Sequence, residues 1–152
     1  MSITITRESP DTADASSLIG ELDALLAPLY PVQSRHGYSV ERLLREGTAF
    51  FVARAEGEPA GCGGLQLVGW EYGEIKRMYV RPQFRRLGLA RQMLDHLTDY
   101  ARARDIGLLR LETGVHQVEA INLYERLGFR RIAPFGPYRV DRLSLCYEKY
   151  IS

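Results

Sequence analysis

The sequence predicts an α/β (α+β) fold in which a mixed sheet carries helices on both of its faces. Two observations support this prediction. Short apolar runs bounded by turn residues, typical of strands, alternate along the chain with segments whose apolar residues recur at helical spacing. The chain has 152 residues, of which 45% are hydrophobic and 26% charged. This composition is that of a globular protein, and the length suits one domain, residues 1–152, that folds without a disulfide or a metal.

A strand and two helices are predicted first. Isoleucine alternates with threonine over residues 3–6, which indicates a strand. Leucines then recur at helical spacing as far as Ala27, with either Asp11 or Thr12 as the N-cap, and prolines end this helix. A shorter helix follows Ser39.

The later elements follow the same two patterns. The turn Glu56-Gly57-Glu58-Pro59 between two apolar runs predicts a β-hairpin. Gly107 opens a further strand, and Gly128 is placed to end the last helix. The predicted strands are 49–55, 60–68, 74–80, 108–113, 129–133 and 143–150, and the predicted helices are 87–104 and 118–127.

Charge and cysteine content exclude several classes of function. The net charge of +1 gives no general attraction to nucleic acid or to an anionic membrane, so neither is expected as a partner. The two cysteines have no CxxC spacing and the three histidines are scattered, so no metal is expected. No apolar run approaches the roughly 20 residues that span a bilayer, and the N-terminus lacks the pattern of a signal peptide. We therefore expect a cytoplasmic protein.

The segment from Val80 to Ala90 carries most of the functional information. It lies where a strand gives way to a helix, and a helix start offers unpaired N–H groups and the positive end of a dipole to an anion. Two small residues, Gly88 and Ala90, allow an anion to approach the backbone closely. Positive charge comes from Arg85, Arg86 and Arg91. The segment therefore indicates a pyrophosphate site, although a solvated basic helix start has the same pattern. Neither a Walker loop nor a GxGxxG motif is present.

Two motifs resemble those of the GNAT N-acetyltransferase family. Val80 to Ala90 reads Val-x-Pro-x-x-Arg-x-x-Gly-x-Ala, similar to the family's coenzyme A signature, and Ala120 to Phe129 resembles its second signature, Ala-x-x-Leu-Tyr-Glu-x-x-Gly-Phe. The resemblance is sharpest from Glu74 to Phe129. It implies a mixed, mostly antiparallel sheet of six to seven strands, with a splay between strands four and five, and acetyl-CoA as the co-substrate.

The resemblance also implies a set of cofactor-binding residues. The strand before the loop would bind pantetheine, the loop would bind the pyrophosphate mostly through backbone N–H groups, and Gln117 stands where the family often has asparagine. These residues are Met78, Tyr79 and Val80, then Arg85, Arg86, Leu87, Gly88, Leu89, Ala90 and Arg91, and finally Gln117.

Acetyl transfer to an amine needs a neutral amine and a proton for the leaving thiolate. Tyr124 matches the tyrosine that the family uses as general acid, although an aromatic residue on the inner face of a helix is also a usual packing residue. Glu112 is our candidate for the base, with Glu74 as its rival and a structural carboxylate as the alternative.

The acceptor is less well defined by the sequence. Because strand side chains alternate, one of Lys76 and Arg77 should face the cleft, and Arg77 is a candidate for binding a substrate carboxylate, with Tyr138 on the far wall. We expect a small-molecule amine, such as an amino acid. Alternatives are a protein or peptide amine, a non-catalytic acetyl-CoA-binding module, and nucleic-acid binding through the loop arginines. Relatives often pair through their C-terminal strands, so the resemblance also implies a homodimer.

Overall fold

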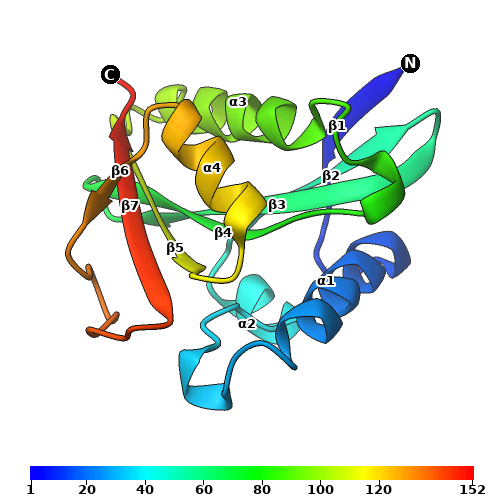
Figure 1. The fold of residues 1–152 in the computed structure, drawn as a ribbon. Coiled ribbons are helices and arrows are strands. Elements are labelled where there is room, and N and C mark those ends of the chain that lie inside the picture. The colour runs from blue at the N-terminus through cyan, green and yellow to red at the C-terminus, as the bar shows by residue number, and fades with distance from the viewer.

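A computed structural model describes residues 1–152, which form a seven-stranded sheet between two pairs of helices (Figure 1). The predicted mixed α/β fold is confirmed. The strands are β1 (Ile3–Arg7), β2 (Ala49–Ala55), β3 (Glu58–Val68), β4 (Tyr72–Val80), β5 (Leu108–Gly114), β6 (Arg130–Ile132) and β7 (Ser144–Tyr150). The helices are α1 (Ala13–Leu26), α2 (Val40–Arg45), α3 (Leu89–Arg102) and α4 (Val118–Arg126), and short 3-10 turns occupy Val32–Ser34 and Pro82–Phe84. None of the helices has both the length and the apolar character needed to cross a membrane.

The strands lie in the order β1-β2-β3-β4-β5-β7-β6, and every neighbouring pair is antiparallel except β4 and β5. The parallel pair makes only two register contacts, Gly73 with Leu109 and Glu74 with Arg110. Beyond Glu74, β4 therefore has no strand partner on its β5 side. The predicted splay between the fourth and fifth strands is confirmed.

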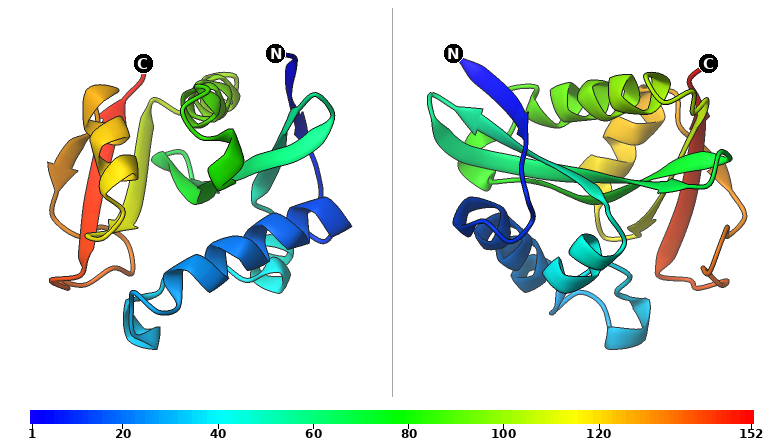
Figure 2. Two further views of the ribbon diagram at one scale, coloured as in Figure 1. Left: turned by 45° about the vertical axis from the view of Figure 1, so that its right-hand side comes forward. Right: turned by 180° about the vertical axis from the view of Figure 1, so that it is seen from behind.

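Helices cover both faces of the sheet (Figure 2), and each face has its own apolar layer. The α3 helix buries residues 89, 93, 94, 97 and 101, a single stripe at helical spacing, against the larger layer, which also contains Tyr124 of α4. On the opposite face, α1 and Leu43 of α2 cover a smaller layer. The alternation of β2 places Phe51 in the first layer and Phe50 in the second.

A β-bulge interrupts β4 at Arg77. Cys62 pairs with Tyr79 but Gly64 pairs with Lys76, so two residues of β4 lie opposite Gly63 alone. Arg77 adopts a φ of 58°, and a Cβ on Gly63 would lie 2.8 Å from the Met78 sulfur, so this position suits glycine. The expected alternation is wrong here, because the bulge turns both Lys76 and Arg77 toward the α1–α2 face, where they contact Tyr38 and α1 respectively.

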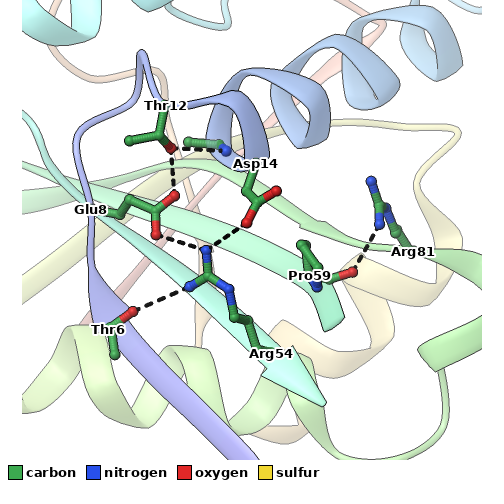
Figure 3. A network of polar contacts seen from close by, with 8 residues as sticks. Thr6, Glu8, Thr12, Asp14, Arg54, Pro59 and Arg81 are labelled. Carbon is green, nitrogen blue, oxygen red and sulfur yellow. Dashed lines mark hydrogen bonds and ion pairs between the residues drawn. The ribbon is translucent and has the colours of Figure 1, made fainter. Parts of the chain in front are cut away.

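Arginines from the sheet hold α1 in place. Arg54 of β2 bonds Glu8 at 2.9 Å and Asp14 at 2.8 Å, next to the Thr12 side chain that caps the helix (Figure 3). At the end of β4, Arg81 bonds Glu21 of α1 at 2.7 Å. The orientation of α1 matters because this helix forms part of the cleft described next.

Candidate active site

A cleft of about 730 Å³ lies where β4 and β5 separate. All the residues expected to hold the cofactor line it except Leu87, which is 43% exposed on the outside of the loop. Tyr124 lines it too. Leu22 and Leu25 of α1 contribute from one face of the sheet, and residues of α3 and α4 contribute from the other. The splay thus opens one continuous site to both helix layers.

The start of α3 offers unpaired backbone N–H groups to this cleft. The first helical hydrogen bond runs from Gln92 N–H to the Gly88 carbonyl at 3.0 Å, so the N–H groups of Leu89, Ala90 and Arg91 have no intrahelical acceptor. No side chain caps this helix, and Gly88 takes a left-handed φ of 80°. The space beside the Gly88 Cα is open, with the nearest atom of other residues 3.9 Å from where a Cβ would stand. These features fit a bound pyrophosphate.

The loop arginines differ in what they can contact. Arg85 bonds the Val80 carbonyl through Nε at 3.0 Å, which braces the loop, while Arg86 and Arg91 line the cleft without a protein acceptor. Arg81 is taken up by Glu21 and by the Pro59 carbonyl. Arg126 of α4 adds a cation to the lining that the sequence did not single out.

Tyr124 presents a phenol with no protein partner. Its side chain comes from α4, is 6% exposed, and packs edge to face on Phe129 with ring centroids 5.6 Å apart. The hydroxyl makes no hydrogen bond with the protein, and burial in apolar surroundings raises its pKa. The residue is therefore protonated at neutral pH and has a free donor facing the cleft.

A buried polar cluster lies on the α1–α2 face of β4. Lys76 bonds Glu74 at 2.9 Å and the Tyr138 hydroxyl at 2.8 Å, and that hydroxyl in turn donates to Glu74. Burial lowers the pKa of Lys76, and the Glu74 charge partly opposes this. Glu74 is thus committed to two partners. Tyr138, expected on the far wall of the cleft, joins this cluster and is not among the residues that line the cleft.

Glu112 stands on the same face but has no cation at ion-pair distance. It is half-buried on β5 and accepts a hydrogen bond of 2.6 Å from the Ser144 hydroxyl. Burial raises its pKa, while the Ser144 bond and the charges of His36 and Lys76 act in the opposite direction. A carboxylate in this situation is better placed to take a proton than Glu74.

Arg77 lies elsewhere than the acceptor hypothesis requires. Its guanidinium bonds Asp23 and the Ile19 carbonyl of α1, and its side chain is 3% exposed. A Cβ on Gly37 would collide with Arg77 Nη1, so the neighbouring loop closes over the side chain. This position serves to fix α1 rather than to meet a substrate carboxylate.

Several lining residues had no signal in the sequence. Asn122 of α4 lines the cleft, as does Gln117. Leu22 and Leu25 of α1 border the cleft only because of the way α1 packs. Ser144 is not among the lining residues, and the pairing of β7 with β5 brings its hydroxyl to Glu112. The spacing of the leucines in α1 predicted its apolar stripe. It did not predict that the end of this stripe borders the cleft.

Comparison with known proteins defines the class. The model of the acetyltransferase (GNAT) family matches residues 20–129. The chain is 43% identical over 148 residues to an IAA acetyltransferase of Azospirillum brasilense, with 97% of each chain covered. It is 34% identical to an uncharacterised N-acetyltransferase of Bacillus subtilis (strain 168), covering 88% of this chain and 89% of that one. The protein belongs to the GNAT family and is an acetyltransferase.

Solved structures of acyltransferases have the same fold. A putative acyl-CoA N-acyltransferase from Klebsiella pneumoniae superposes with a TM-score of 0.84 at 36% identity, over 99% of this chain and 98% of that one. An N-acetyltransferase from Thermoplasma acidophilum, solved with coenzyme A, superposes with a TM-score of 0.77 over 99% of both chains, but at 22% identity. The latter likeness shows the shared fold.

Proposed function

We propose that this protein transfers an acetyl group from acetyl-CoA to the primary amine of a small molecule. The observation that carries the proposal is the cleft at the splay, where the unpaired N–H groups at the start of α3 and the free phenol of Tyr124 lie in one cavity. Bound acetyl-CoA would supply the acetyl group as a thioester. Two proteins of the same fold were solved with coenzyme A or acetyl-CoA, which supports this choice of co-substrate.

Different parts of the site would bind different parts of acetyl-CoA. The N–H groups of Leu89, Ala90 and Arg91 meet the pyrophosphate, with Arg86 adding charge. The β5 side of β4 has no strand partner beyond Glu74, so its free backbone groups are available to the amides of pantetheine.

Two side chains handle protons. Glu112 takes the proton from the acceptor amine, because its carboxylate is ionised above its raised pKa and has no cation of its own. Tyr124 keeps its phenolic proton at neutral pH and gives it to the departing sulfur, for which its hydroxyl has no competing protein acceptor.

The acceptor end favours a small substrate. The loop after α1 is joined to the loop before β7 by the Ser34 hydroxyl, which donates to Asp141 at 2.7 Å, and by T-shaped packing of the His36 and Tyr138 rings. These contacts close two loops over the polar cluster. The name of the Azospirillum brasilense relative refers to IAA, which supports a small acceptor and makes that compound one to test.

The test is a panel of acceptors with release of the free thiol of coenzyme A as the readout. It should contain small amines with and without a carboxylate, IAA, and short peptides with free N-termini or lysines. We expect acetylation of a small amine that depends on Tyr124. Turnover only with peptides would replace the small-molecule acceptor by a protein one. Calorimetric binding of acetyl-CoA without turnover on any acceptor would favour a non-catalytic module, and no binding at all would refute the proposal.

A further inference from the structure

Tyr30 joins two parts of the molecule that the sheet leaves apart. It lies just after α1 and is 5% exposed. Its hydroxyl accepts a hydrogen bond from the His116 N–H at 2.9 Å and donates one to Gln117 Oε1 at 3.1 Å. Both partners belong to the turn between β5 and α4. Its ring also packs on the His116 ring with centroids 5.3 Å apart.

This contact spans the open end of the splay. On one side, α1 is tied to the end of β4, because Glu21 accepts hydrogen bonds from Arg81 at 2.7 Å and from the Tyr79 hydroxyl at 3.1 Å. On the other side, Gln117 follows β5, which no longer pairs with β4 at this level. Gly114 leaves the necessary room, since a Cβ there would lie 2.1 Å from the Tyr30 hydroxyl oxygen.

The hydrogen bond from the Tyr30 hydroxyl to Gln117 Oε1 also sets the direction of the Gln117 amide, and the bond from the His116 N–H orients that hydroxyl. Gln117 lines the cleft, and its carbonyl oxygen is occupied by Tyr30. Its amide nitrogen has no partner in the protein, so both of its N–H donors are free. A side chain with free torsions would otherwise lose part of its binding energy to rotamer entropy.

We propose that Tyr30 is a positioning residue that holds Gln117 with its amide nitrogen toward the bound cofactor. The inference rests on the proposed function, because it takes the cleft to be the acetyl-CoA site. It adds a residue of the loop after α1 to the parts that determine cofactor affinity, although its hydroxyl is satisfied by protein partners.

The experiment measures acetyl-CoA affinity by calorimetry in Tyr30→Phe, Gln117→Leu and the double variant. Tyr30→Phe keeps the ring and removes the hydroxyl, and we expect the Kd to rise roughly three- to tenfold, the scale of one neutral hydrogen bond. Gln117→Leu should weaken binding to a similar extent. In the double variant, the loss should equal that of Gln117→Leu alone, because Tyr30 then has nothing to orient.

A kinetic split adds a second readout. Tyr30→Phe should raise the KM for acetyl-CoA while leaving kcat at saturating cofactor close to that of the unsubstituted protein. Tyr100→Phe is the matched control. Tyr100 lies on α3 outside the cleft, and its hydroxyl accepts a hydrogen bond of 3.3 Å from Arg7, so its loss should change neither KM nor kcat.

The outcomes separate the two ideas. If the unsubstituted protein binds no acetyl-CoA, the proposed function fails. If it binds but Tyr30→Phe binds equally well, or if Tyr30→Phe and Gln117→Leu weaken binding additively, the positioning role of Tyr30 is overturned. Should Tyr30→Phe not fold, Gln117→Leu still tests the proposal, since unchanged affinity in that variant would overturn it.

Discussion

Tyr124 and Glu112 have their protonation states set by different surroundings. Tyr124 sits among apolar side chains with no partner, so burial alone raises the pKa of its phenol. Burial also raises the pKa of Glu112, but the Ser144 hydroxyl and the nearby charges of His36 and Lys76 act in the opposite direction and favour the ionised form. A phenol that keeps its proton and a carboxylate that can accept one are therefore available at the same pH.

Replacing Tyr124 by phenylalanine should lower kcat roughly 100-fold, the scale of a lost general acid. Affinity for acetyl-CoA should change little, because the ring and its packing on Phe129 are kept. The rate of thiol release gives kcat, and calorimetry on the same preparation gives the affinity for acetyl-CoA. Unimpaired turnover would show that Tyr124 only packs.

The acidic limb of the pH–rate profile should report Glu112. Its pKa in the folded protein lies above the ordinary value of 4.5, and the ionised form is the active one, so kcat/KM should fall as the pH drops through that raised pKa. Ser144→Ala removes a hydrogen bond that lowers this pKa, so the limb should move to higher pH. Glu112→Gln should remove the limb and most of the rate. An unmoved limb in Ser144→Ala would assign it to another group.

At the scale of elements, one strand–turn–helix unit supplies most of the proposed cofactor site. β4 loses its β5 partner, the turn after it takes positive φ at Arg86 and Gly88, and α3 begins without a cap. Each of these would be a defect in a purely structural segment, since backbone groups stay unpaired. Together they make a surface of free N–H groups at the positive end of a helix.

Gly88→Glu should abolish measurable binding of acetyl-CoA while the protein stays folded. The side chain has open space to occupy, so the expected effect is a carboxylate placed where an anion binds, plus a backbone cost of about 1–2 kcal/mol for a left-handed residue. Gly57→Glu is the matched control. Its φ of 83° imposes the same strain in the β2–β3 turn, where nothing lies within 4 Å of a Cβ, and its affinity should be unchanged. Equal affinity in both variants would remove the pyrophosphate site from this turn.

At the scale of the whole molecule, α1 forms one wall of the cleft, and ion pairs with arginines attach this helix to the sheet. Three sheet arginines, Arg54, Arg77 and Arg81, pair with acidic residues along the helix. The apolar layer under α1 is the smaller of the two, so these ion pairs carry a larger share of its attachment. They hold the end of α1 beside the cleft, where Tyr30 reaches across.

Arg54→Met should destabilise the protein by about 1–2 kcal/mol, because it leaves Glu8 without its cation and removes a partner of Asp14. Urea unfolding measures this as a lower midpoint at unchanged slope. Arg45→Met, at an exposed arginine of α2 without an ion pair, should fall within about 0.5 kcal/mol of the unsubstituted protein. Equal midpoints for the two variants would mean that the network shown in Figure 3 adds nothing.

The sequence determined the elements and the cofactor segment. Hydrophobic periodicity gave each strand and long helix to within a few residues, and Thr12, one of the two expected caps, does cap α1. The glycine and arginines after β4 indicated the turn that we propose as the pyrophosphate site. These features are local: periodicity, caps and turn conformations follow from neighbouring residues, so they can be predicted without a structure.

Only the tertiary structure decided the acceptor side. The bulge at Arg77 turned two consecutive side chains to one face, which no period of two predicts. Our proposal of Glu112 rather than Glu74 as the base rests on contacts with Lys76, Tyr138 and Ser144, which come from different strands and loops. Tyr30 reached Gln117 across 87 positions of sequence. Charge, burial and hydrogen bonding depend on which distant residues meet, and this is fixed by packing rather than by local pattern.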